Sequence, residues 1–409
     1  MLRKAVFAVV CLAACGGDDG GDGGDFPKPG ELAAFPLTSV HGGIAYTVKV
    51  TIGGGQTFDL DIDTGSTTLG VAATSCTSCP TQLLPKYAPG SSAKDQMKTS
   101  QTTYGDGSGW TAENFMDSVR LDGAGEDIAM RFGAIGTDNN FFRAPLFDQG
   151  IVGFASELIA LGGTDSFVAK RIAAGDNGQF AFQFCPDAGT LWMNGFDPAA
   201  ATESPQFSPM VPVSRSQPFY EVDITSAKIG DVATTLSGEA VVDTGTSLLV
   251  VSSAAQASLL DAINNSAGWK SMFPGTTLDE NACFTGVTKT HAELDAALPP
   301  LTFTFPGTLS FTFTLPATQS YMIDVPDSGL CYGVAAADGL PTIMGDVVMR
   351  NFVTVFDVTA MQIGFAPTKG CDFGKPMQKR GVTQTGKPPA WRIRPDVRAH
   401  LVNAALRGD

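Results

Sequence analysis

The chain has 409 residues, of which 43% are apolar and 16% are charged, and its formal net charge at neutral pH is −15. The apolar content suffices for two packed lobes, and the negative charge argues against nucleic acid as a partner, because phosphate binding needs a basic surface. The three histidines (His41, His291 and His400) are far apart, and the sequence lacks HExxH, paired CxxC and GxSxG motifs. These absences argue against the common zinc sites and against elbow-type serine hydrolases.

The first 36 residues predict an export signal followed by a tether. A basic start (Met1 to Lys4) precedes a short apolar core (Ala5 to Leu12) and the sequence Leu-Ala-Ala-Cys15. This core is shorter than the roughly 20 residues of a membrane span, and the layout of residues 1–15 resembles a bacterial lipoprotein signal with a lipidated Cys15. An ordinary signal cleaved nearby is the alternative. Residues 16–36, rich in Gly and Asp, are typical of a flexible tether.

Strand-like patterns dominate the chain from residue 37 onward. YTVKVTI, LTFTFPG and LSFTFTL alternate apolar and polar residues with a period of two, and long helical periodicity is nearly absent. This pattern predicts an all-β protein.

Two segments repeat a motif at domain scale. FDLDIDTGSTTLGV (58–71) and GEAVVDTGTSLLVV (238–251) each place Asp-Thr-Gly-Ser/Thr after a strand-like apolar run, with Asp63 and Asp243 separated by 180 residues. A strand followed by a glycine turn would explain one copy, but two ordered copies indicate duplication.

Each motif is followed, 90 to 102 residues later, by apolar residues and a glycine: Gly153 in DQGIVGFA and Gly345 in PTIMGDVV. One duplication of this size predicts two homologous lobes, 37–205 and 206–371, with the boundary near the proline-rich stretch 205–212. A basic tail, 372–409, then carries eight Lys or Arg against three Asp.

Two Asp-Thr-Gly motifs suit the hydrolysis of a peptide bond. One ionised carboxylate can take a proton from water, while a protonated partner donates to the scissile carbonyl, so the pair shares one proton. Gly65 and Gly245 permit a tight turn that brings N–H groups near the carboxylates. Ser66 and Thr246 can donate to the carboxylates, and Thr64 and Thr244 can hydrogen-bond across a pseudo-twofold axis. Each motif would therefore supply half of one site, at Asp63 and Asp243.

The sequence resembles the pepsin family of aspartic proteases over approximately residues 37–371. The resemblance rests on FDLDIDTGST, TTYGDGSG, DQGIVGFA, VPVS, AVVDTGTSLL, IMGDVVMRNFVTVFD and IGFAP, in that order. It implies a bilobal fold with a central cleft and an aspartic endopeptidase with an acidic pH optimum. It also implies that Tyr104, Gly105 and Asp106 lie in a hairpin, the flap, that closes over the substrate; a plain surface hairpin is the alternative.

Six cysteines remain after the leader, and counting alone allows 15 pairings. A redox role for Cys76 and Cys79 is disfavoured because no βαβ context surrounds them. The resemblance implies a second-lobe bridge, Cys283–Cys331, and, as in the plant nepenthesin-like branch, a bridge Cys185–Cys371. The expected pairing is therefore Cys76–Cys79, Cys185–Cys371 and Cys283–Cys331.

The sequence departs from the family in three places. Gly70 stands where a tryptophan usually steadies the flap tyrosine; Trp110 can replace it or can be a packing residue. Asp61, on the same strand face as Asp63, can line a substrate pocket at a place where the family often has an aliphatic residue, or can bond to nearby backbone. Nucellin-like plant relatives share its LDIDTGS wording. Only 19 residues separate Cys15 from Phe35, too few for a conventional inhibitory pro-segment.

The basic tail is interpreted as disordered or as an electrostatic latch across the acidic cleft. Overall, we expect an exported, membrane-anchored lipoprotein that is monomeric, requires no metal or organic cofactor, and cleaves polypeptides. A non-catalytic pepsin-fold binding or inhibitor protein is the main alternative, and an inert surface adhesin is the third.

Overall fold

The structure is a computed structural model that describes residues 28, 30–124, 126–143, 148–213, 218–326, 328–372 and 383–384. The predicted signal, Cys15, most of the tether and most of the basic tail lie outside these residues. Within the described ranges, no helix has both the length and the apolar character needed to cross a bilayer.

The fold is built mainly from β-strands, as the period-two patterns predict. The largest sheet has 13 strands. In spatial order these are β11 (Gln206–Pro209), β25 (Gln362–Pro367), β24 (Phe352–Asp357), β9 (Gln179–Phe184), β10 (Ala188–Met193), β1 (Ala33–Val40), β2 (Ala45–Ile52), β3 (Gln56–Asp63), β8 (Gly150–Gly153), β4 (Gly70–Ala72), β7 (Ile128–Asn139), β6 (Gly109–Leu121) and β5 (Lys94–Thr103).

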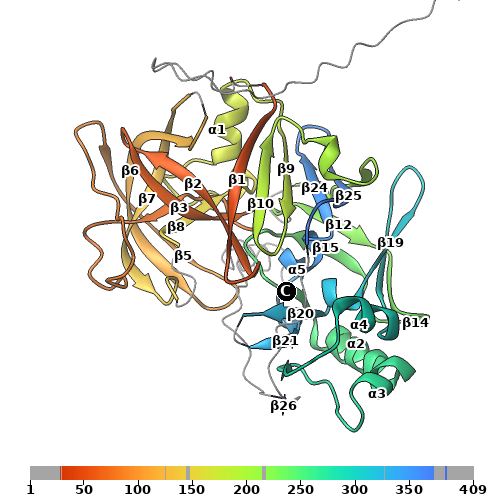
Figure 1. Ribbon diagram of the computed structural model, residues 1–409. Coiled ribbons are helices and arrows are strands. Elements are labelled where there is room, and N and C mark those ends of the chain that lie inside the picture. Colours follow the sequence, from red (N-terminus) through yellow and green to blue (C-terminus); the bar gives the residue numbers. More distant parts are fainter. Residues whose placement is uncertain are drawn as a thin grey trace, which may run out of the picture.

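This sheet contains strands from both halves of the chain. Strands β24 and β25 come from the second half, yet β24 pairs antiparallel with β9, with Thr354 opposite Phe182. The proline-rich stretch at the expected boundary contains β11, which pairs with β25. The strip from β11 to β1 therefore lies between the two halves and joins them, as Figure 1 shows.

Three smaller sheets belong to the second half. One contains β12 (Glu221–Ile224), β15 (Gly238–Val242), β23 (Thr342–Met344), β16 (Leu249–Val251) and β22 (Val334–Ala336). Another contains β14 (Val232–Ala233), β13 (Ser226–Ile229), β18 (Leu301–Phe305) and β19 (Phe311–Leu315). The third contains β20 (Met322–Val325), β21 (Gly329–Tyr332), β17 (Cys283–Thr285) and β26 (Thr383–Gln384), so a short piece of the tail extends a second-half sheet.

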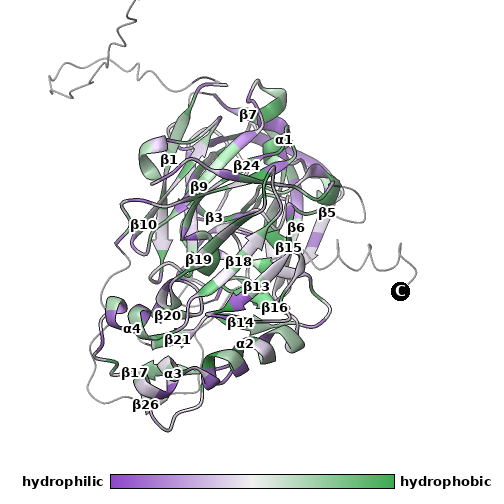
Figure 2. Cartoon of the chain, turned by 90° about the vertical axis from the view of Figure 1, so that its right-hand side faces the viewer, coloured by the Kyte–Doolittle hydropathy of each residue, from purple (hydrophilic) through white to green (hydrophobic). Residues whose placement is uncertain are grey.

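The helices are short, and the first four α-helices each begin after a serine or threonine whose side chain accepts a hydrogen bond from the first turn. The helices are α1 (Phe167–Ala173), α2 (Ser253–Asn265), α3 (Ala267–Met272), α4 (His291–Ala297) and α5 (Asp346–Met349), with 3-10 turns η1 (Glu157–Ile159), η2 (Pro198–Ala200) and η3 (Ala317–Gln319). Ser252 caps α2, and Thr290 forms a capping box with Glu293 at α4. Figures 1 and 2 both show α2, α3 and α4 at the end of the molecule opposite α1.

The alternating residues of the strands form the core. In β18 and β19, Phe303 and Phe313 face each other and are buried, whereas the threonines between them are more exposed. Burial of a phenylalanine side chain contributes about 2 kcal/mol, so this pattern fixes which face of the hairpin packs inward.

The six described cysteines form three disulfides: Cys76–Cys79, Cys185–Cys371 and Cys283–Cys331. This is the pairing that the family resemblance implies. The Cys185–Cys371 bridge closes a segment of 186 residues and ties the end of β9 to the chain just after β25.

Candidate active site

Equivalent strands deliver the two candidate aspartates to the centre of the molecule. Asp63 is the last residue of β3, which pairs in parallel with β8, and Asp243 directly follows β15, which pairs in parallel with β23. The Phe154 N–H donates to the Asp63 carbonyl at 2.7 Å, and the Asp243 N–H donates to the Met344 carbonyl at 3.1 Å. The repeat in the sequence thus corresponds to a repeated strand arrangement.

The glycines that follow each motif allow these strands to approach the catalytic loops. A Cβ atom on Gly153 would lie 2.5 Å from the Ser66 carbonyl oxygen, and one on Gly345 would lie 2.2 Å from the Thr246 carbonyl oxygen. Both distances are too short for any side chain. The 90- and 102-residue spacings in the sequence therefore reflect two equivalent close contacts.

Reciprocal hydrogen bonds between Thr64 and Thr244 join the two loops. The Thr64 N–H donates to Thr244 Oγ1 at 3.0 Å, and the Thr244 N–H donates to Thr64 Oγ1 at 3.0 Å. Each hydroxyl also donates across the axis: Thr64 Oγ1 to the Val242 carbonyl at 2.8 Å, and Thr244 Oγ1 to the Ile62 carbonyl at 2.7 Å. These four buried bonds hold the loops face to face.

Each carboxylate receives the same two local donors. The Gly65 N–H donates to Asp63 Oδ1 at 2.8 Å, and the Gly245 N–H donates to Asp243 Oδ1 at 2.9 Å. The Ser66 hydroxyl donates to Asp63 Oδ2, and the Thr246 hydroxyl donates to Asp243 Oδ2 at 2.6 Å. Four of the support residues predicted from the motifs therefore contact a carboxylate: Gly65, Ser66, Gly245 and Thr246. The other two, Thr64 and Thr244, contact the opposite loop.

The two carboxyl groups meet. They lie within hydrogen-bonding distance of each other, and a Cβ atom on Gly65 would be 2.7 Å from the Asp243 carboxyl group. Both side chains are fully buried. Burial raises the pKa of Asp63 well above its usual range, and the nearby Asp243 carboxyl raises that pKa further.

Burial likewise raises the pKa of Asp243, although the donors around it oppose this rise. Two buried carboxyls in contact favour a state in which the pair holds one proton, because simultaneous ionisation would place two negative charges side by side. Such a pair can accept a proton from one oxygen atom and donate one to another.

Asp61 is also fully buried, beside Asp63 on β3. Its backbone lies opposite Thr47 of β2 and Ile151 of β8. The Asp61 charge adds a smaller contribution to the raised pKa of Asp63, so the two residues are electrostatically coupled.

Tyr104, Gly105 and Asp106 lie in the turn between β5 and β6. The Tyr104 N–H donates to the Ser108 carbonyl at 2.8 Å, the Gly107 N–H donates to the Tyr104 carbonyl at 2.9 Å, and Gly107 has a φ of 77°. Asp106 forms an ion pair with Arg143, a partner that the sequence did not reveal. The Tyr104 side chain is buried rather than exposed at the tip.

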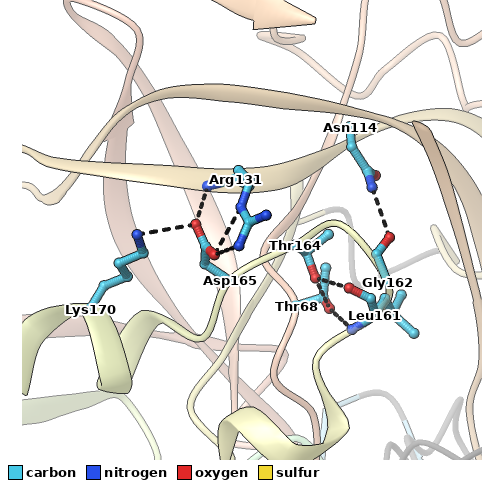
Figure 3. Close-up of polar contacts among 8 residues, drawn as sticks. All are labelled: Thr68, Asn114, Arg131, Leu161, Gly162, Thr164, Asp165 and Lys170. Carbon is cyan, nitrogen blue, oxygen red and sulfur yellow. Dashed lines mark hydrogen bonds and ion pairs between the residues drawn. The ribbon is translucent and has the colours of Figure 1, made fainter. Parts of the chain in front are cut away.

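Residues 156–164 contact the chain that leaves the first motif, and the sequence did not indicate this contact. Thr67 Oγ1 donates to the Ser156 carbonyl at 2.6 Å, and Thr68 Oγ1 lies 3.0 Å from Thr164 Oγ1. Figure 3 shows Thr68 bonded to this segment, beside an ion-pair cluster in which Arg131 and Lys170 both contact Asp165. Single threonines and lone charges in loops carry no periodic signal, so only the folded chain identifies these contacts.

Among the residues that the structure describes, no group of three or more His, Cys, Asp or Glu side chains is arranged to hold a metal ion.

Comparison with known proteins gives a consistent result. The profile of the family described as eukaryotic aspartyl protease matches residues 45–368. An aspartic protease of Phaffia rhodozyma is 28% identical over 339 residues, which cover 82% of this chain and 79% of that protein. Rhizopuspepsin-2 of Rhizopus niveus is 29% identical over 347 residues, covering 82% and 81%, and pepsin-2B of Gadus morhua is 26% identical over 328 residues, covering 76% and 92%.

Proposed function

The chain belongs to the eukaryotic aspartyl protease, or pepsin, family and is an aspartic endopeptidase; from this premise we propose that Asp63 and Asp243 activate the water that attacks the peptide bond. The contact between their two buried carboxyl groups, each with matching donors, is the observation that carries this proposal.

In the proposed mechanism, the dyad starts with a single shared proton. The ionised carboxylate takes a proton from water as the oxygen atom attacks the carbonyl carbon, and the protonated carboxyl donates to the carbonyl oxygen, which gains negative charge. The carboxyl that took the proton from water then gives it to the amide nitrogen as the C–N bond breaks, and one hydroxyl of the tetrahedral intermediate returns its proton to the other carboxylate, so that the dyad again holds one proton. The hydroxyls of Ser66 and Thr246 fix Oδ2 of the two carboxyl groups, and the mechanism places the water between the groups.

The proposed substrate is an extended polypeptide lying between the lobes, with Tyr104 and its hairpin over it. Asp61 is proposed to influence the choice of cleavage site, because a carboxylate next to the dyad favours a basic or polar substrate side chain. The complete burial of Asp61 supports the alternative role, a carboxylate held within the strand environment. Replacing Asp61 by leucine separates the two: altered site preference supports the first role, and unchanged preference at reduced stability supports the second.

We further propose that the chain is a monomeric, exported lipoprotein consisting of lobes 37–205 and 206–371, anchored through Cys15 and the tether. The three disulfides are typical of exported proteins. Mass spectrometry of the mature N-terminus tests the anchor: a diacylglyceryl modification on Cys15 supports it, and a free N-terminus at another residue contradicts it.

The basic tail is proposed to act as an electrostatic latch on the acidic body. Residues 30–372 contain 15 Lys or Arg and 35 Asp or Glu, whereas residues 373–409 contain eight Lys or Arg and two Asp. Opposite net charges attract, and the pairing of β26 with β17 places residues 383 and 384 against the second half.

The decisive experiment measures cleavage of a peptide library at pH 3–6, with and without pepstatin. Wild-type enzyme should cleave, and Asp63→Asn and Asp243→Asn should each abolish cleavage, because an amide cannot supply the carboxylate base. Asp59→Asn is a matched control on the same strand, since Asp59 is partly exposed and pairs with Lys49. Cleavage by Asp63→Asn would refute the mechanism, and a wild-type protein that binds peptides without cleaving them would favour the non-catalytic alternative.

A further inference from the structure

Two glycines on neighbouring strands form a slot beneath an indole ring. Gly70 of β4 and Gly133 of β7 are register partners in a parallel pair. A Cβ atom on Gly70 would have Trp110 Cζ2 as its nearest neighbour, at 3.0 Å. One on Gly133 would lie 2.9 Å from Ala112 Cβ and 3.3 Å from Trp110 Cζ3. The benzo ring of Trp110 therefore rests against both glycines, in space that any side chain at either position would enter.

The same indole makes a hydrogen bond to the hairpin. Trp110 Nε1 donates to the Tyr104 hydroxyl oxygen at 3.0 Å, and each side chain is only 1% exposed. Because an indole has a single N–H donor and a buried donor needs an acceptor, this bond fixes where the phenol oxygen lies relative to the ring.

Further contacts hold the same end of the hairpin. The Tyr104 ring lies 5.5 Å, centroid to centroid, from the Phe141 ring. Two residues after each of these, Asp106 and Arg143 form an ion pair. Tyr104 is thus restrained on its ring by Phe141 and on its hydroxyl by Trp110. Through Trp110, the Tyr104 hydroxyl is linked to Gly70 of β4 and Gly133 of β7, and β4 lies next to β8 of the parallel pair β3–β8.

We propose that Trp110, seated in the Gly70–Gly133 slot, is the positioning residue that sets the place of Tyr104 over the cleft. The inference rests on the proposed function, because the position of the hairpin matters to catalysis only if substrate lies beneath it. The glycines fix the indole, the indole fixes the phenol oxygen, and the buried Tyr104 side chain then anchors the hairpin that closes over the substrate. Preset groups raise the rate by removing the need to order them during the reaction.

A double-mutant cycle tests the bond itself. Trp110→Phe keeps an aromatic ring but removes the N–H, and Tyr104→Phe removes the acceptor. The single Trp110→Phe variant should lower kcat/KM about fivefold, the equivalent of one net hydrogen bond, whereas the same change in the Tyr104→Phe background should have little further effect. Equal losses in both backgrounds would show that Trp110 acts only through packing and would overturn the proposal, as would an unchanged kcat/KM.

The slot is tested separately with added methyl groups. Gly70→Ala, whose added methyl group would meet the indole first, should displace the ring and reproduce the loss of kcat/KM. Gly133→Ala should have a similar effect, although its methyl group would also press on Ala112. Gly136→Ala is the matched control on β7, because a Cβ atom there would have its nearest neighbour, Ser75 Oγ, at 3.9 Å. If Gly70→Ala and Gly136→Ala retain the same kcat/KM, the slot does not position the indole.

The outcomes of these tests are distinct from failure of the catalytic assignment. Cleavage by Asp63→Asn would remove the dyad mechanism regardless of Trp110, whereas additive effects of Trp110→Phe and Tyr104→Phe would remove only the positioning role.

Discussion

Replacement of Thr244 by valine should destabilise the protein because it removes the hydroxyl at the centre of the interlobe contact. The Thr64 N–H then loses its acceptor at 3.0 Å, and the Ile62 carbonyl loses its donor at 2.7 Å. Both bonds are buried, so water cannot replace the lost partner. Each orphaned backbone group costs about 2 kcal/mol, which gives a loss of about 4 kcal/mol in the free energy of unfolding.

This loss converts to a measurable change in melting temperature. With an unfolding entropy of about 2.1 cal/mol/K per residue and about 340 residues unfolding together, the Tm should fall by about 6 °C. Calorimetry under non-reducing conditions provides the measurement. Thr244→Ser is the control, because it keeps the hydroxyl and loses only a methyl group.

The symmetry of the contact provides a second check. Thr64→Val removes a different pair of bonds, those to the Thr244 N–H and the Val242 carbonyl, so its effect should be similar. Because the two threonines belong to one buried network, the loss in the double variant should depart from the sum of the two single losses. If Thr244→Val melts at the same temperature as Thr244→Ser, the threonine hydroxyls do not hold the lobes together and the reasoning is wrong.

Three further predictions concern charge, covalent linkage and the tail. The raised pKa values of the dyad mean that the folded state binds protons more strongly than the unfolded chain, so the dyad's stabilising contribution is complete below the unfolded pKa of about 3.8 and is lost as pH rises through the folded pKa values. The Tm of Asp63→Asn should therefore fall less than the Tm of the wild type between pH 4 and pH 7. Parallel Tm profiles would contradict this prediction. Removal of the Cys185–Cys371 bridge by serine substitution should lower the free energy of unfolding by up to about 5 kcal/mol, because this bridge closes 186 residues. Removal of Cys76–Cys79, which closes only three, should lower it by about 1.5 kcal/mol. Equal Tm losses would argue against the chain-entropy explanation. Replacing the Lys and Arg residues of 385–409 by glutamine, which leaves β26 intact, should raise kcat/KM at low salt and have little effect at high salt, whereas a rate that is unchanged at both salt concentrations would exclude the latch.

The candidate site around Asp63 and Asp243 could be predicted from the sequence because its information is local and repeated. Each Asp-Thr-Gly-Ser/Thr motif contains the carboxylate, the glycine N–H that bonds to it and the hydroxyl that bonds to it, within four residues. The threonine exchange across the axis followed from having two copies, since a symmetric pair of loops places equivalent groups face to face. The period-two patterns likewise predicted β-strands, because alternation along a strand directly determines which side chains face the core.

Tertiary structure alone decided the features whose partners are distant in sequence and follow no periodic pattern. The sequence left two interpretations of Trp110, as a replacement for the tryptophan missing at position 70 or as a packing residue. The slot also needs Gly133, whose role depends on the parallel register of β4 and β7. The pairing of Asp106 with Arg143 depends on where the chain goes after β7, and the sharing of one sheet by β24 and β9 depends on how the two halves meet. Local rules determine what each segment can form, whereas long-range packing selects which segments come into contact.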